Sequence, residues 1–241
     1  MNKHIRGALC VLLCLLCAAL PAGLPAYAAQ NTAAEETSAP EQTAVLKIYS
    51  VADFLEFAEA CRLDSYSLGL TVSLEADLDL SGRVFESVPI FCGTFRGNGH
   101  TVRGVELTGA GSVQGLFRYL TDTARVEDLH LNVAVQPGGS RSTVGGIAGE
   151  NAGKILECRF NGTVSGGDSI GGIAGINTVT GIIEKCRVYG TVTGSHFTGG
   201  IAGENEGVVR SCSNSAAVNT TPQQNTVDIN DITLETITNT E

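Results

Sequence analysis

Three cysteines recur at regular intervals along the chain and could ligate a metal ion if their side chains met. Cys158 and Cys186 are 28 residues apart, and Cys186 and Cys212 are 26 apart. Thiolate sulfur is a common zinc ligand, yet Leu129 occupies the matching position one copy earlier. Because leucine can stand at this position and free cysteine is usually buried, we predict an apolar column, with no metal or cofactor site.

Two further pairs of residues could do chemistry. Asp77 and Asp79 would place two carboxylates on one strand face, as calcium binding or acid–base catalysis could use. Calcium sites need several oxygen ligands close together, and the spacing supplies no third acid. Asp128 and His130 would also share a strand face, but such a pair needs a placed nucleophile. We therefore predict no catalytic residues, with a carbohydrate-active β-helix enzyme as the alternative.

An internal repeat sets the positions of these residues. The phrase Gly-Gly-Ile-Ala-Gly occurs at 145–149, 171–175 and 199–203, and asparagine, cysteine and valine follow each copy at matching spacing. The middle copy carries two extra residues in a turn around 178–180. Self-similarity with a period of about 20 to 50 residues indicates a stacked solenoid. The repeated positions are Gly146, Ile147, Gly149, Asn151, Cys158, Val164, Gly172, Ile173, Gly175, Asn177, Cys186, Val192, Gly200, Ile201, Gly203, Asn205, Cys212 and Val218.

Each copy contains too much glycine for long strands. Cys158, Phe160 and Val164 are separated by even numbers of residues, so their side chains would point to one face of a strand. We predict an all-β fold, a parallel β-helix of about five rungs and about three short strands per turn, with an N-terminal α-helical cap. Like residues would lie over like, so the repeated asparagines would hydrogen-bond along the axis.

The outward-facing columns hold both attractive and repulsive neighbours. Glu157 would lie beside Lys185, an attraction of about 0.2–1 kcal/mol. Arg159 would lie beside Arg187 and repel it by a similar amount, unless Glu157 relieves the repulsion. None of these columns places two carboxylates side by side, which argues against a glycan-cleaving pair.

The chain divides into five segments by composition. Residues 1–28 have the basic start, apolar run and small-residue end of a secretory signal, with cleavage near Ala28. Residues 29–43 form a disordered linker, and 44–92 form the N-terminal cap. The cap contains a helix over 51–62, begun by Ser50 and Asp53, and a half-buried strand around Val72. The β-helix occupies 93–220, and 221–241 is a flexible acidic tail.

Charge and cysteine content limit the partners. The formal net charge is −10, and loss of Lys3 and Arg6 with the signal leaves 13 basic and 25 acidic residues, or −12. This balance argues against nucleic acid, whose binding needs a basic surface. No second long apolar run follows the signal, so we predict no membrane span in the mature chain. Five cysteines remain after cleavage, an odd number that suggests a free thiol.

The glycine phrases resemble the GLUG motif of bacterial surface proteins, which is named for a Gly-Leu/Ile-x-Gly core. The matching residues are 146–149, 172–175 and 200–203, each with its downstream cysteine and valine. The resemblance implies a secreted or surface-displayed protein with a right-handed parallel β-helix. Similar repeats occur in non-catalytic regions of immunoglobulin-A-cleaving zinc metalloproteases. The chain has no His-Glu-x-x-His zinc motif, so within such a parent it would be the stalk.

We therefore predict a non-catalytic secreted or cell-surface solenoid that serves for binding, adhesion or spacing. Its partner would be a host or bacterial glycan or protein at the cell surface. Solenoids bind through broad faces and turns, and the candidate variable turns here are 178–180 and 195–197. Within the second turn, Phe197 is expected to pack at a corner of the coil. The alternatives are the carbohydrate-active enzyme and the stalk of a larger surface protease.

Overall fold

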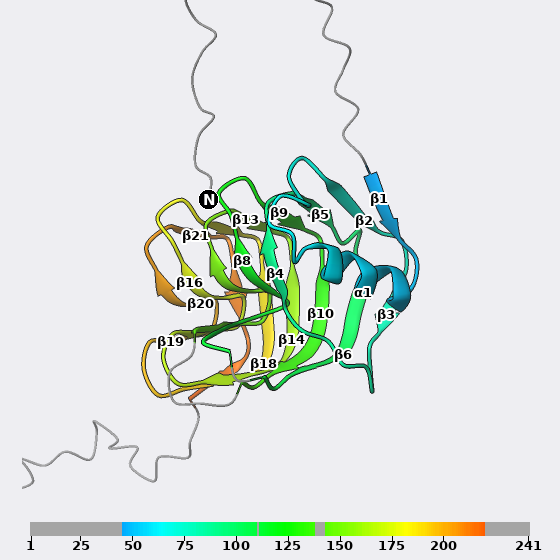
Figure 1. Ribbon diagram of the computed structural model, residues 1–241. Helices are drawn as coiled ribbons and strands as arrows, with labels where there is room; N and C mark the ends of the chain where they lie inside the picture. Colours follow the sequence, from blue (N-terminus) through cyan, green and yellow to red (C-terminus); the bar gives the residue numbers. More distant parts are fainter. Residues whose placement is uncertain (1–44, 110, 138–142, 220–241) are drawn as a thin grey trace, which may run out of the picture. The chain divides into compact units, whose positions relative to one another are not determined.

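The computed structural model describes residues 45–109, 111–137 and 143–219. These residues form a β-solenoid of about six turns, in which short strands coil around one axis (Figure 1). The coil thus has about one turn more than the sequence predicts. The predicted signal (1–28), linker (29–43) and tail (221–241) lie outside the described residues.

Four parallel sheets run along the axis, so a full turn contributes four short strands and not the expected three. Sheet A contains β1 (Val45–Ile48), β2 (Thr71–Leu74), β5 (Thr94–Arg96), β9 (Arg125–Glu127), β13 (Lys154–Leu156), β17 (Ile182–Glu184) and β21 (Val208–Arg210). Sheet B contains β3 (Leu78–Asp79), β6 (Thr101–Leu107), β10 (His130–Val135), β14 (Arg159–Gly166), β18 (Arg187–Gly194), β22 (Ser213–Asn214) and β23 (Ala217–Val218). Sheet C contains β4 (Val88–Phe91), β8 (Phe117–Leu120), β12 (Ala148–Asn151), β16 (Ala174–Asn177) and β20 (Ala202–Asn205). Sheet D contains β7 (Val113–Gln114), β11 (Thr143–Gly145), β15 (Ile170–Gly171) and β19 (Thr198–Gly199).

Successive turns of the repeat lie in register, so equivalent residues stack. Strands β14 and β18 pair along their whole length, with Arg159 opposite Arg187. The side-chain amide of Asn151 donates to Asn177 at 2.7 Å, and that of Asn177 donates to Asn205 at 2.7 Å. The first two of these asparagines are fully buried. The predicted asparagine ladder is confirmed.

The weaker copy that precedes the three repeats departs from this register at one place. Val113 pairs with Thr143, and Gln114 therefore lies opposite Val144. Aligning Val113-Gln114-Gly115-Leu116 of this copy with Val144-Gly145-Gly146-Ile147 of the next predicts Val113 opposite Val144, which is wrong by one residue. The link from sheet D to sheet C is one residue shorter in this copy, which shifts the pairing. A buried glutamine thus occupies a column that holds a buried valine one turn later.

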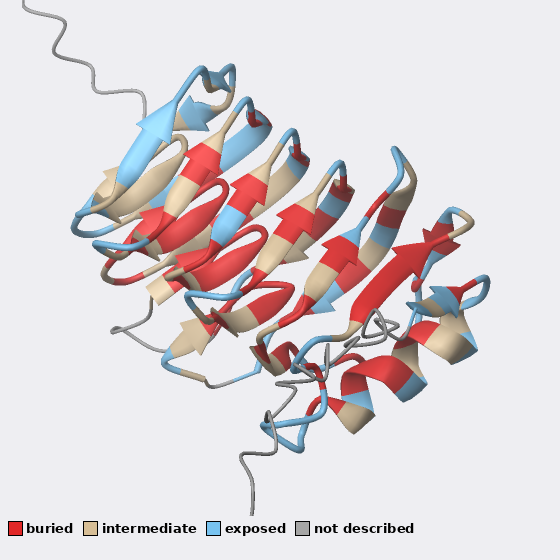
Figure 2. Ribbon diagram, turned by 90° about the horizontal axis from the view of Figure 1, so that it is seen from above, coloured by how far each residue is buried: buried red, intermediate tan, exposed pale blue. Residues whose placement is uncertain are grey.

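The interior consists of stacked columns of apolar side chains, seen as the buried inner strands of Figure 2. Cys158 and Cys186 are fully buried and Cys212 is partly buried, as expected for an apolar column. All five cysteines of the described residues are free thiols. Glycine is needed where a turn crosses this core, since a side chain at Gly146 would collide with the ring of Phe160.

A helix, α1 (Val51–Ala60), covers the first turns. It ends two residues before the predicted position, because the chain turns at Cys61. Its start carries the predicted capping box: Asp53 N donates to Ser50 Oγ at 3.3 Å, and Ser50 N donates to Asp53 Oδ2 at 2.9 Å. The buried face of α1 joins a cluster of rings from nearby strands: Phe54, Phe57, Phe85, Phe91, Phe95 and Phe117.

Strand β2 is buried on both faces, whereas the sequence predicts a half-buried strand. Its outward-facing Ser73 is covered by the next turn of the coil. The side-chain amide of Asn98 donates to Ser73 Oγ at 2.9 Å and to the carbonyl of Leu74 at 2.9 Å. A neighbouring turn can therefore bury a polar residue that the alternation of apolar and polar residues in a strand predicts to be exposed.

Candidate functional site

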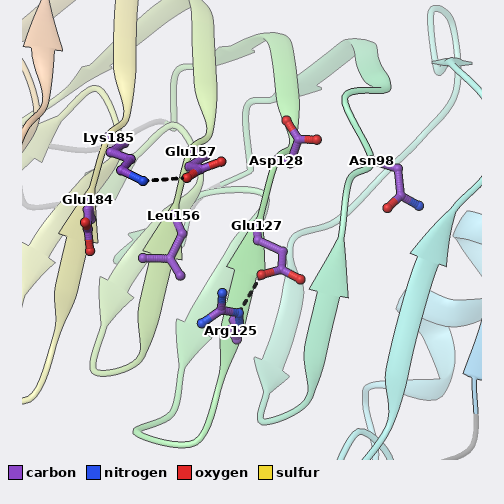
Figure 3. Close-up of a pocket in the computed structure, with 8 residues that line it drawn as sticks. All are labelled: Asn98, Arg125, Glu127, Asp128, Leu156, Glu157, Glu184 and Lys185. Carbon is purple, nitrogen blue, oxygen red and sulfur yellow. Dashed lines mark hydrogen bonds and ion pairs between the residues drawn. The ribbon is translucent and has the colours of Figure 1, made fainter.

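A corner between sheets A and B repeats a left-handed backbone conformation in five successive turns. Asn98, Asp128, Glu157, Lys185 and Ser211 have φ of 51°, 48°, 57°, 55° and 54°. Such values are uncommon outside glycine and asparagine. The corner turns the chain just before the buried cysteine column and directs charged side chains outward (Figure 3).

The groove beside this corner has a volume of about 500 Å³, but its charges are mostly compensated. Lys185 Nζ lies 2.9 Å from Glu157 Oε1, and Arg125 Nε lies 2.5 Å from Glu127 Oε2 (Figure 3). The hydrogen bond that Lys185 donates to Glu157 raises the pKa of Lys185. The predicted Glu157–Lys185 attraction is confirmed. Since Glu157 pairs with Lys185, it does not form an ion pair with Arg159 or Arg187.

The predicted pair of Asp77 and Asp79 does not form one site. Asp77 accepts from Thr101 N at 2.8 Å and contacts His100 Nδ1 at 3.2 Å. Asp79 instead accepts from Ser81 N at 3.0 Å and forms an ion pair with Arg103 of β6, the neighbouring strand in sheet B. Hydrogen bonds from Ser81, and then from Arg103, lower the pKa of Asp79 to about 2. Each carboxylate is thus held by its own partners.

Asp128 and His130 do not share a strand face, which corrects the sequence prediction. Asp128 lies in the corner turn with φ 48°, between β9 and β10, whereas His130 begins β10. The left-handed turn breaks the alternation on which the prediction rested. Burial lowers the pKa of His130, and the charge of Arg159 lowers it further.

The cysteine thiols donate to backbone carbonyls. Cys158, Cys186 and Cys212 contact the carbonyl oxygen two residues earlier at 3.2, 3.4 and 3.3 Å. Contact with the Cys158 thiol raises the pKa of Cys186 well above its usual range, which disfavours the thiolate that metals bind. No group of three or more His, Cys, Asp or Glu side chains is arranged to hold a metal ion within the described ranges.

The outer face of sheet B carries a column of basic side chains, two of which are arginines directly opposite each other. His130 lies opposite Arg159, and Arg159 lies opposite Arg187. Both arginines are exposed, and neither has an ion pair within the part of the chain that the structure describes. The predicted juxtaposition of like charges is confirmed and stays uncompensated, because Glu157 turns to Lys185. We call Arg159 and Arg187 the cationic column; His130 stands beside it with a lowered pKa, which favours its neutral form.

Beside the cationic column runs a second column of hydrogen-bonding and aromatic groups. Asn132, Asn161 and Tyr189 lie opposite one another on β10, β14 and β18, and the tyrosine is 41% exposed. A bulge in β6, between Arg103 and Glu106, shifts its pairing with β10 after Asn132. A groove of about 340 Å³ follows this bulge and is lined by Arg103 and Thr163 among others. Sheet B therefore offers cations, amides, hydroxyls and a ring on one exposed surface.

The two predicted variable turns are both exposed. Val179 is 74% exposed and Phe197 is 63% exposed. The expectation that Phe197 packs at a corner is wrong, because the turn around it protrudes from the last turns of the coil and no further turn covers it within the described residues.

Three comparisons place the chain among known proteins. No protein-family model matches it. Halomucin from Haloquadratum walsbyi (strain DSM 16790 / HBSQ001) is 30% identical over 147 residues, which is 56% of this chain but 2% of halomucin. The chain thus spans a very small part of the curated relative that it matches.

A solved structure from Bacteroides ovatus, provisionally assigned as an immunoglobulin A1 protease, is 22% identical. The alignment covers 71% of this chain and 63% of that one, with a TM-score of 0.46. At this level we draw no argument from it. Among the described residues, no helix is long and apolar enough to cross a membrane.

Proposed function

We propose that this chain is a non-catalytic β-solenoid module of a secreted or cell-surface protein, and that it binds its ligand on the outer face of sheet B. The observation that carries the proposal is the cationic column, in which Arg159 and Arg187 lie in adjacent strands without an acid beside them. Like charges directly opposite each other are destabilising. A ligand that brings negative charge would relieve this repulsion, so the arrangement favours the bound state.

The surface suits an acidic glycan. Arginine binds carboxylate and sulfate groups through its planar fork of N–H donors. The neighbouring amides of Asn132 and Asn161 can bond to hydroxyls, and Tyr189 offers a ring for packing. Support for a surface location comes from the likeness to halomucin, a protein named as a mucin, and from the resemblance of the repeats to the GLUG motif. A protein partner with an acidic face would use the same groups.

The test is binding of the chain without its predicted signal, residues 29–241, to an array of acidic and neutral glycans. We expect retention of uronic or sulfated glycans that weakens with salt, because exposed charges are screened. The double variant Arg159→Gln with Arg187→Gln should bind about tenfold or more weakly. Lys154→Gln, at an exposed cation on sheet A that has no ion pair within the described residues, is the control for loss of positive charge elsewhere. Equal binding by the double variant and the parent would contradict the proposal.

The absence of catalysis is part of the proposal and has its own test. The same glycans, incubated with the chain, should release no new reducing ends. Chain cleavage that is lost on replacing Asp77 or Asp128 would establish the enzyme alternative. Asp128 is the sharper of the two, because its carboxylate has no hydrogen bond or ion pair within the described residues.

A further inference from the structure

Arg118 is an unusual residue at its place in the fold. It lies in β8 between Phe117 and Tyr119, which pair with Ala148 and Glu150, so it stands where the next turn has Gly149. Its Nε–H is buried and has no hydrogen-bond partner within the described residues. No acidic side chain there forms an ion pair with it. A buried charged donor that lacks a partner costs stability.

Arg118 lines a cavity of about 670 Å³ that also contains Arg83, Ser87 and Gln114. Ser87 Oγ donates to Gln114 Oε1 at 2.8 Å, and both residues are buried. This bond occupies the carbonyl end of the glutamine side chain and leaves its amide N–H groups as donors. The shifted register of this copy brings Gln114 into the column, so the cavity is special to this turn. Three sets of N–H donors therefore line one cavity.

The acids around the cavity do not neutralise these donors. Glu86 is 2.9 Å from Arg62 Nη2 and is engaged there. Glu106 is exposed, and no ion pair joins it to either arginine of the cavity. In a chain of net charge −10, the cavity thus gathers two arginines whose charges no ion pair balances within the described residues.

We propose that this cavity binds an oxyanion group, the carboxylate or sulfate of a small ligand, held by Arg118 and Gln114. Because Nε is shielded in the unbound chain, the guanidinium would turn toward the ligand and donate through Nε–H and one Nη–H to two oxygens, the fork geometry that arginine offers. The Gln114 amide would donate to the same group from the side, and Arg83 would add charge at the mouth. This site is separate from the outer face of sheet B and does not depend on the proposed function.

The experiment is titration calorimetry of residues 29–241 with sodium sulfate, sodium acetate and N-acetylneuraminate, against neutral N-acetylglucosamine at constant ionic strength. We expect saturable binding of at least one anion and none of the neutral sugar. Binding of sulfate or acetate alone assigns the site to simple oxyanions. Binding of N-acetylneuraminate only assigns it to acidic saccharides, and both outcomes support the proposal.

Variants connect the binding to this cavity. Arg118→Gln should weaken binding about tenfold or more, whereas Lys154→Gln, with the same loss of charge, should leave it unchanged. If Arg118→Gln does not fold, Arg83→Gln at the exposed mouth should still weaken binding by a few-fold. The Arg159→Gln, Arg187→Gln pair should not affect this titration, which separates it from glycan binding on sheet B. No saturable binding of any anion, or unchanged binding by the folded cavity variants, would overturn the proposal.

Discussion

The two ends of the coil are built differently, although the same repeat principle runs between them. At the first turns, α1 and the aromatic cluster cover the core, and Phe54, Phe57 and Phe91 are 0–1% exposed. At the last described turn, Val208 and Val209 are 44% and 36% exposed. Figure 2 shows this contrast as a change from buried inner turns to exposed and intermediate strands at one end.

Equivalent residues in neighbouring turns show what causes the difference. Ile183 is fully buried, and Val209, which pairs with it one turn later, is more than one third exposed. Asn177 is likewise fully buried, whereas Asn205 is exposed. Burial in a solenoid therefore depends on the turn stacked above as much as on the residue itself. Identical substitutions should have large effects in covered turns and small effects at the open end.

The largest effect is expected from Phe57→Ala in the covered end. Phe57 packs against Phe91 and Phe95 with ring centroids 5.9 Å away in each case. The cavity left behind should lower the free energy of unfolding by about 3–5 kcal/mol. Val209→Ala at the open end should cost less than about 1 kcal/mol. Urea unfolding followed by circular dichroism compares them, and similar losses would refute the contrast between the ends.

The second test breaks the asparagine ladder at two heights. Asn177→Ala removes a buried side chain that bonds to both neighbours, so Asn151 Nδ2 keeps only its 3.3 Å bond to the Gly153 carbonyl and Asn205 Oδ1 loses its donor. We expect a loss of about 2 kcal/mol, while Asn205→Ala should cost a few tenths, since water can replace its single ladder bond. Denaturant midpoints measure both. A larger loss at Asn205 would mean that the last turn is covered in solution.

Thiol labelling compares the ends without changing the sequence. Cys61 is fully buried beneath the covered end, and burial raises its pKa to about 12. Cys158 and Cys186 are also fully buried, whereas Cys92 and Cys212 are partly exposed. Alkylation followed by mass spectrometry should modify Cys92 first, Cys212 more slowly because its contact with Cys186 raises its pKa, and the other three only on unfolding. Early modification of Cys61 would indicate that α1 opens.

The smallest effect concerns His130, which lies between covered turns. Burial lowers its pKa below 6.5, Arg159 acts in the same direction, and Asp128 and Asp77 oppose it. The unfolded chain therefore binds more protons between the folded pKa and 6.5, so stability should fall slightly as pH drops below about 6.5. His130→Gln should flatten this part of the profile. An unchanged slope in the variant would assign the pH dependence to other groups.

The stacked columns could be predicted because the repeat fixes the register. Asn151 over Asn177, Arg159 over Arg187 and the apolar cysteine column all follow from superimposing copies of one sequence. Such predictions need only the spacing of the repeats, because successive side chains of a strand point alternately inward and outward. The confirmed Glu157–Lys185 pair belongs to the same class.

The details that depend on local backbone geometry could not be predicted in this way. Aspartate is only a weak signal for a left-handed residue, and Glu157 and Lys185 at the same corner give none, so the corner that removes Asp128 from the strand face was missed. The one-residue shift at Gln114 arises because the link from sheet D to sheet C is shorter in this copy. Superimposing the repeats predicts a pairing that is displaced by one residue. The cavity at Arg118 follows from that shift. The sequence did contain one sign of this cavity, since Arg118 stands where the next repeat has Gly149.

The two extra residues of the middle repeat show how this scaffold could be engineered. Thr178 N donates to the Asn151 carbonyl at 2.9 Å and Thr180 Oγ1 donates to the Ala152 carbonyl at 2.8 Å, so both ends of the longer turn are fixed to the preceding turn. Val179 stands between these anchors and faces solvent. A foreign peptide inserted at Val179 would therefore have both of its ends anchored to the preceding turn of the coil. Epitopes placed at successive corners could thus be displayed at a regular spacing of about 4.8 Å per strand step.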